Sequence, residues 1–190
     1  LCEEQFEFDI VLTSILKNIE YDKEKFSDSL NKLVDCANEL NNFDFRVLNT
    51  YEIPNTLIRI GPKEDGGYVI ADGFDYDLFI SCGIANDIRF EEAFLDLYPE
   101  LACLAFDGTI QSFPVTPKNI KWIARNIAPY PSSNQSDLSD VLDGISDAFL
   151  KMDIEGAEFD WINNIGEDML ERIAQIVIEI HWPFDIYRAR

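Results

Sequence analysis

Basic residues are scarce in this chain of 190 residues, which has 15 Lys and Arg against 36 Asp and Glu and a formal net charge of −21 at pH 7. Proteins that bind nucleic acid or anionic membranes neutralise phosphate groups with basic side chains. The composition therefore argues against a primary role in binding nucleic acid or an anionic membrane. An acidic pocket suits a metal ion or a cationic small molecule instead.

Long hydrophobic runs and closely spaced cysteines are also absent. No window approaches the roughly 18 apolar residues of a membrane span, and the acidic residues 1–9 lack the basic region of a signal peptide. The four cysteines form no CxxC pair, which indicates neither a zinc site nor a disulfide framework. We therefore expect a soluble, cytoplasmic protein with buried free thiols. The start at Leu1 suggests a domain of a longer polypeptide.

Hydrophobic residues nevertheless make up 47% of the chain, which is enough for a globular fold. Apolar residues recur at helical spacing over residues 5–42, so we predict an N-terminal helical extension over residues 1–45. This extension either caps a substrate cleft or covers a face or edge of a sheet. Residues 46–190 are then expected to form one α/β domain.

Short apolar runs alternate with amphipathic stretches in the second part of the chain. Near-continuous apolar strands separated by helices indicate a parallel sheet covered on both faces, which is a doubly wound, Rossmann-like α/β fold. Such sheets bind ligands beyond the carboxyl ends of their strands. A hairpin is predicted before the sheet, around a glycine-rich turn. The predicted strands are 57–60 and 68–71 in the hairpin and 78–82, 101–106, 120–124, 148–152 and 176–180 in the sheet, with helices near 90–97 and 159–165.

The first predicted strand of the sheet is followed by a single glycine, Gly83. A dinucleotide site needs GxGxxG at this place, so that the pyrophosphate can approach bare backbone. The pattern thus argues against NAD and for a nucleoside ligand without phosphates. The next strand ends at Asp107, where Rossmann-like sheets carry an acid that holds ribose hydroxyls. The alternative is that Gly83 makes a tight turn and Asp107 is a turn residue or helix cap.

Charged residues alternate at the end of the fourth predicted strand, where Lys151, Asp153 and Glu155 share one face if the strand extends that far. Charges on a buried strand are costly unless they lie at its exposed end and are paired or bound to a metal. The alternative is a structural pair of Lys151 with Asp153, beside acids at Glu155 and Glu158 that stabilise a helix N-terminus.

The last predicted strand ends in a similar pair, Glu179 and His181, which point the same way. His181 is the single histidine of the chain. If this strand neighbours that of Asp153, the three side chains converge. Two carboxylates and one imidazole suit Mg²⁺ or Mn²⁺ better than tetrahedral zinc. The alternative for His181 is a packed or solvated histidine.

These motifs together resemble the FkbM-type methyltransferases. The run 150–158 looks like the hallmark of that family, and the closing residues 178–181 are also similar. The segments 59–69 and 81–91 resemble motifs of one branch of it. The resemblance covers about residues 59–182 and leaves the predicted N-terminal extension outside.

The resemblance implies a class I methyltransferase fold, S-adenosylmethionine as methyl donor and a hydroxyl acceptor on a sugar, a glycan or another small molecule. It also implies where the ligands bind. That fold normally continues past its fifth strand, whereas this chain stops ten residues after Ile180, so we expect shortened or missing C-terminal strands. The implied cofactor-binding residues are Ser81, Cys82 and Gly83 at the methionine and ribose, Asp107 at the ribose, and Lys63 and Tyr68 at the cofactor or its entrance; Asp153, Glu179 and His181 match the metal ligands of related metal-dependent O-methyltransferases.

The leading hypothesis is methyl transfer from S-adenosylmethionine to a hydroxyl, with Asp153, His181 and Lys151 as catalytic residues. A divalent metal would lower the pKa of the acceptor hydroxyl. His181, if it is not a ligand, could act as general base. Lys151 is a second candidate base or an electrostatic partner of Asp153. The alternatives are a metal-dependent hydrolase using the same acids and histidine, or a non-catalytic module whose acidic surface binds a basic partner.

Overall fold

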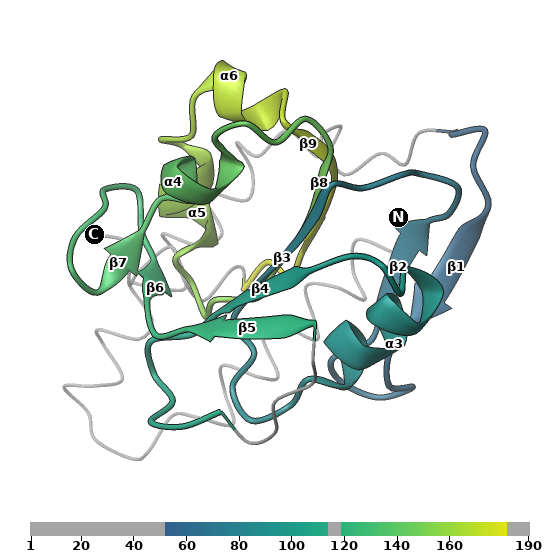
Figure 1. The fold of residues 1–190 in the computed structure, drawn as a ribbon, viewed down its shortest axis with the longest axis horizontal. Coiled ribbons are helices and arrows are strands. Elements are labelled where there is room, and N and C mark those ends of the chain that lie inside the picture. The colour runs from purple at the N-terminus through teal and green to yellow at the C-terminus, as the bar shows by residue number, and fades with distance from the viewer. Residues whose placement is uncertain (1–51, 114–118, 182–190) are drawn as a thin grey trace, which may run out of the picture. The chain divides into compact units, whose positions relative to one another are not determined.

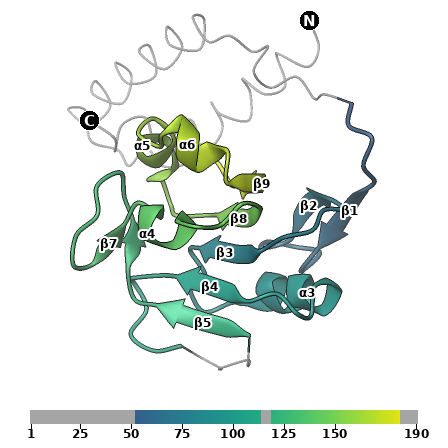
Figure 2. The same ribbon diagram turned by 45° about the horizontal axis from the view of Figure 1, so that its top comes forward.

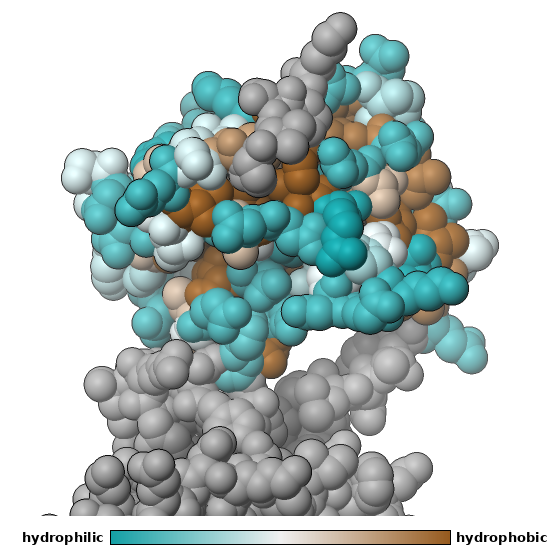
Figure 3. Space-filling view, turned by 90° about the horizontal axis from the view of Figure 1, so that it is seen from below, coloured by the Kyte–Doolittle hydropathy of each residue, from teal (hydrophilic) through white to brown (hydrophobic). Residues whose placement is uncertain are grey.

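The computed structural model describes residues 52–113 and 119–181. The helical extension predicted for residues 1–45, and the prediction of shortened or missing strands at the C-terminus, lie outside the described residues. Within the described ranges, no helix is long and apolar enough to cross a bilayer. The surface in Figure 3 shows hydrophilic side chains around smaller hydrophobic areas.

A five-stranded parallel sheet forms the centre of the fold (Figure 1). It confirms the predicted α/β sheet, because each of the five apolar runs forms one of its strands. All residues of β3 and β8 are buried, which explains why their sequences are mostly apolar and show no alternation of apolar and polar residues. In spatial order the strands are β5 (Ile120–Ile123), β4 (Cys103–Phe106), β3 (Leu78–Cys82), β8 (Ala148–Met152) and β9 (Ile173–Ile178).

Helices cover both faces of this sheet, as Figures 1 and 2 show. One face packs against α3 and the predicted antiparallel hairpin of β1 and β2, through residues such as Phe79 and Phe149. The other face packs against α4, α5 and α6, through residues such as Ile80 and Leu150. The doubly wound fold is therefore confirmed. The bounds are β1 (Leu57–Ile60), β2 (Tyr68–Ala71), α3 (Arg89–Leu97), α4 (Ser139–Leu142), α5 (Glu158–Ile162) and α6 (Glu167–Leu170), with a small parallel pair of β6 (Asn126–Ile127) and β7 (Gln135–Ser136).

Aromatic rings fill the core between the sheet and α3. Phe94 of the helix lies with its ring centroid 4.2 Å from that of Phe149 and 4.6 Å from that of Phe79. The predicted spacing of Phe90, Phe94 and Leu97 places the first two of these on the buried side of α3, while Leu97 is largely exposed. This packing fixes the helix, and with it the residues of its first turn, against the sheet.

The last strand differs from its prediction at both ends. It begins at Ile173 and ends at Ile178, two residues before the predicted end. The backbone N–H of Glu179 still donates to the carbonyl of Met152. Glu179 therefore lies directly beyond the sheet, beside the residue that follows β8.

The strand order reverses between β3 and β8. From β3 the chain moves outward through β4 to β5, and it then returns to β8 and moves outward to β9 on the other side. The loops that leave β3 and β8 thus run in opposite directions and open a crevice between them. All five strands are parallel, so the residues that follow them meet at one edge.

Candidate active site

A pocket of about 550 Å³ lies at this edge, where β3, β4 and β8 end. Its size is typical of sites for small molecules. Six of its lining residues are acidic and two are basic, so the pocket itself favours a cationic ligand. The residues that matter most to its chemistry are Gly83 after β3, Glu91 on α3, Asp107 after β4, and Lys151 and Asp153 at the end of β8.

Gly83 is required by the close approach of two strand ends. Its φ is +76°, a value that residues other than glycine rarely adopt. A Cβ at this position would overlap the carbonyl oxygen of Asp153. Its N–H donates to the carbonyl of Phe106, 2.9 Å away. The backbone of Gly83 therefore joins the ends of β4 and β8 at the floor of the pocket.

Asp107 holds the turn after β3. Its Oδ2 accepts the N–H groups of Ile84 and Ala85 at 3.2 and 2.8 Å, and its Oδ1 accepts the N–H and hydroxyl of Thr109 at 2.8 and 2.6 Å. Although burial opposes this, the donors at Thr109, Ala85 and Ile84 hold the pKa of Asp107 below its usual range. The turn role is thus visible directly, and the ribose role stays a prediction.

We expect Asp107→Asn to lower the free energy of unfolding at pH 7 by about 1–3 kcal/mol, because the charged acceptor of three backbone N–H groups is lost. The lowered folded-state pKa makes this contribution present above the unfolded-state value of about 3.9. It is lost as the pH falls through the folded-state pKa. Urea denaturation from pH 7 to pH 3 should show the gap to the unaltered chain closing in acid.

The control for this prediction is Asp96→Asn, at an exposed position of α3. It should change stability by less than about 0.5 kcal/mol. A gap for Asp107→Asn that stays constant down to pH 3 would contradict the assigned cause.

Lys151 points from the sheet into the pocket floor. Its ammonium donates to the carbonyl of Gly83 at 2.6 Å and lies 3.9 Å from Glu91 Oε1 and 4.0 Å from Asp153 Oδ2. Glu91 is 1% exposed and accepts the hydroxyl of Ser81 at 2.5 Å. Burial raises the pKa of Glu91, while Lys151 and Ser81 counteract that rise. Ser81 therefore holds one oxygen of the Glu91 carboxylate in place by a hydrogen bond.

Three other predicted cofactor residues do not line the described pocket. Cys82 packs in the core on the opposite face of the sheet, where burial raises the pKa of its thiol. The carbonyl of Lys63 accepts a hydrogen bond from Arg59, at 3.2 Å, within the hairpin turn. The side chain of Tyr68 lies against the carboxylates of Asp153 and Glu179 instead.

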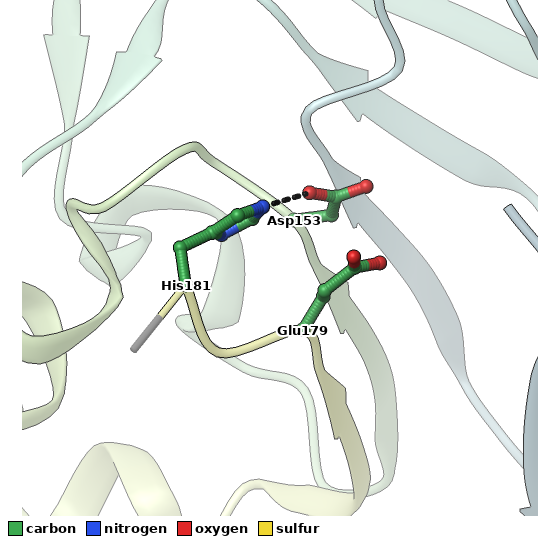
Figure 4. A group of neighbouring side chains, drawn as sticks. All are labelled: Asp153, Glu179 and His181. Atoms are coloured by element: carbon green, nitrogen blue, oxygen red, sulfur yellow. Dashed lines mark ion pairs between the residues drawn. The ribbon is translucent and has the colours of Figure 1, made fainter. Parts of the chain in front are cut away.

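Asp153, Glu179 and His181 converge where β8 and β9 end (Figure 4). One ligand atom from each lies within 4.8 Å of the other two. His181 Nε2 is 3.6 Å from Asp153 Oδ1. The structure thus brings together the three residues that the sequence predicts as a set, while their role stays a prediction.

Glu158 orients the imidazole of His181. It is fully buried, its Oε1 lies 3.1 Å from His181 Nδ1, and it accepts the N–H groups of Ile154 and Gly156 at 2.9 Å. With Nδ1–H donated to Glu158, the lone pair of Nε2 faces Asp153. Burial lowers the pKa of His181, but the carboxylates of Glu158, Glu155 and Asp153 raise it by more than that. The pKa of His181 is therefore above its usual value.

Glu155 does not continue the alternation of Lys151 and Asp153. The strand ends at Met152, and Glu155 has a φ of +56° with its side chain 83% exposed. Its Oε2 still reaches within 3.6 Å of His181 Nε2. Glu155 therefore adds negative charge beside the imidazole from the solvent side.

Tyr68 is a further member of this cluster. Its hydroxyl lies 3.0 Å from Asp153 Oδ2 and 2.8 Å from Glu179 Oε2, and its single proton can be donated to one of them at a time. Burial and the two carboxylates raise the pKa of Tyr68, so it remains a neutral donor. Its ring packs edge-on against Phe90.

A comparison with models of protein families matches residues 54–188 to the methyltransferase FkbM domain. The chain belongs to this family. The FkbM domain is a methyltransferase domain, which agrees with the five-stranded parallel sheet and favours a methyltransferase over the hydrolase and the binding module. Comparisons with curated proteins and with solved structures found no match.

Proposed function

We propose that this FkbM domain transfers a methyl group from S-adenosylmethionine to a hydroxyl group of a small molecule, with help from a divalent metal ion. One observation carries the proposal: Asp153 both lines the pocket and belongs to the cluster with Glu179 and His181. A ligand in the pocket is therefore next to a group of side chains that can bind and activate an acceptor.

The pocket fits the cofactor in three respects. Its volume suits a nucleoside with a short side chain, its lining is acidic, and one buried carboxylate oxygen, Glu91 Oε2, has no hydrogen-bond partner among the described residues. When bound, S-adenosylmethionine would supply the methyl group on a positively charged sulfur.

The proposed cofactor contacts follow from the pocket floor. Gly83 would present its backbone to the ligand. Ser81 would act through Glu91, whose carboxylate accepts its hydroxyl, and Cys82 only through its backbone, because its side chain packs on the opposite face. A ribose hydroxyl could bond to Asp107 in place of the hydroxyl of Thr109, because the four lone-pair positions of that carboxylate already have donors. Lys63 and Tyr68 remain proposed for the cofactor or its entrance, and Tyr68 would also hold the carboxylates of Asp153 and Glu179 there.

The donor set also fits a divalent metal ion. Asp153 and Glu179 provide carboxylate oxygens and His181 provides Nε2, while Glu158 fixes the imidazole through Nδ1 as outer residues of metal sites commonly do. A bound Mg²⁺ or Mn²⁺ would lower the pKa of the acceptor hydroxyl. The hydroxyl of Tyr68 would then lie within hydrogen-bond distance of one of the two carboxylates and no longer of both.

The side chains of this cluster would also handle the proton of the acceptor. His181 can accept a proton only after losing its own, and its raised pKa delays this to higher pH. Lys151 would hold Asp153 and the backbone of Gly83 in place through its ammonium group. The carboxylates of Asp153 and Glu179 would orient the acceptor hydroxyl toward the pocket.

The family resemblance favours a sugar or glycan as acceptor. An intracellular location is supported by Cys82 and Cys103, which are buried free thiols.

Calorimetry with S-adenosylhomocysteine tests the cofactor. We expect saturable binding to the folded chain in the micromolar range or tighter, because the ligand would occupy the acidic pocket. NAD⁺ serves as control ligand and should not bind, since no glycine-rich turn cradles its pyrophosphate. If S-adenosylhomocysteine produces no binding heat at high micromolar concentration, the proposal is wrong.

A further inference from the structure

Resting on the proposed function, we infer that Glu91 and Lys151 form the subsite for the amino-acid head group of the methyl donor, with Glu91 Oε2 accepting the α-ammonium group. Glu91 is then a binding residue that selects a zwitterionic ligand. The remaining part of the pocket would hold the nucleoside.

The carboxylate of Glu91 is only half satisfied in the described structure. Oε1 accepts the hydroxyl of Ser81, but Oε2 is buried and has no partner among residues 52–113 and 119–181. A buried carboxylate oxygen without a donor costs free energy. Because Glu91 lines the pocket, a ligand that brings an N–H donor can remove this cost.

Lys151 supplies the opposite charge next to it. Its ammonium carries three donors, of which one bonds to the carbonyl of Gly83 at 2.6 Å. The carboxylates of Glu91 and Asp153 lie at 3.9 and 4.0 Å, which is too far for hydrogen bonds. Donors of Lys151 are therefore available for the α-carboxylate of a bound amino-acid group.

The distance between the proposed head-group subsite and Asp107 agrees with the length of the cofactor. Asp107 follows β4 and Lys151 lies on β8, with β3 between them. The strands β4 and β8 are therefore two strand spacings, or about 10 Å, apart. A ribose at Asp107 and a head group at Glu91 would put the sulfur near Gly83, beside Asp153.

The unpartnered oxygen favours the ammonium over the sulfonium group as its ligand. Both are positively charged, but a sulfonium has no N–H to donate, and a buried acceptor needs a donor. An ammonium group has three donors and forms charge-assisted hydrogen bonds with carboxylates. The sulfonium would be stabilised less specifically, by the acidic lining as a whole.

The test measures affinity for two ligands by calorimetry on the full chain. They are S-adenosylhomocysteine and its deamino analogue, in which hydrogen replaces the α-ammonium group and the carboxylate is kept. We expect the unaltered chain to bind the deamino analogue about 10- to 100-fold more weakly, as is typical for loss of a charged hydrogen bond. Glu91→Gln should bind S-adenosylhomocysteine about 10- to 100-fold more weakly as well, and should no longer distinguish the two ligands.

Glu92→Gln is the matched control, since it removes the same charge from the exposed neighbouring position of α3. It should leave both affinities unchanged. Equal binding of the two ligands by the unaltered chain would overturn the inference, even if Glu91→Gln fails to fold. So would a folded Glu91→Gln variant that still prefers S-adenosylhomocysteine. If the unaltered chain binds neither ligand, the proposed function itself fails.

Discussion

Gly83→Ala is expected to lower the free energy of unfolding by about 2–5 kcal/mol, because backbone strain and overpacking act together. The φ of +76° disfavours any side chain, and the new methyl group would overlap the carbonyl oxygen of Asp153. That carbonyl belongs to backbone between β8 and α5, which cannot move without disturbing the sheet. Such a loss is a large part of the 5–15 kcal/mol typical of a folded domain.

Gly144→Ala separates the two causes. Gly144 has nearly the same φ, +78°, but nothing lies within 4 Å of the position that its Cβ would take. Its replacement should cost only the left-handed conformation, about 1–2 kcal/mol. Urea denaturation of both variants measures the difference. Equal losses would show that the contact of Gly83 with Asp153 has no energetic importance.

The sequence was sufficient to predict the sheet because its strands are buried on both faces. Such strands are mostly apolar, and the runs at 78–82 and 148–152 are too short for amphipathic helices, so they indicate buried strands. Their polar residues, Ser81 and Lys151, lie near the carboxyl ends. Both strands match their predictions at each end. The last strand was misplaced by two residues at its C-terminus, because Ile180 continues the apolar pattern after the backbone has left the sheet.

The predicted set of Asp153, Glu179 and His181 also converges, since parallel strands end at a common edge. The residues that surround this set were not predicted in these roles. Tyr68 lies 85 residues from Asp153 and 111 from Glu179 in the chain, and its approach depends on how the hairpin packs on the sheet. A signal existed for Glu158, an acid at a helix start, but a buried partner for His181 does not follow from it.

Glu91 illustrates the same limit. Its position in the first turn of α3, next to Phe90, is typical of an ordinary helix with acidic residues near its start. Only the packing of the helix against Ser81 shows that the carboxylate is buried and that one of its oxygens lacks a partner. The burial of a carboxylate and the partners of its oxygens depend on how helices and strands pack against one another, and a local sequence pattern does not reveal this.

If the proposed metal site exists, Asp153→Asn is expected to reduce kcat for methyl transfer by at least about 100-fold, because that site would lose an anionic ligand. The amide is nearly the same size, so the packing around Gly83 should persist. It replaces an oxygen that lies 3.0 Å from the hydroxyl of Tyr68 and 4.0 Å from Lys151. Treatment of the unaltered chain with EDTA should reduce turnover to a similar extent, and added Mn²⁺ should restore it.

Asp160→Asn is the control, at an exposed position of α5 with the same loss of charge. It should keep its activity and its response to EDTA. Binding of Mn²⁺, followed by calorimetry, should be weakened by Asp153→Asn and unaffected by Asp160→Asn. Full activity of the unaltered chain in EDTA would remove the metal from the mechanism. His181, with Nε2 directed at Asp153 by Glu158, would then be the base that takes the proton of the acceptor.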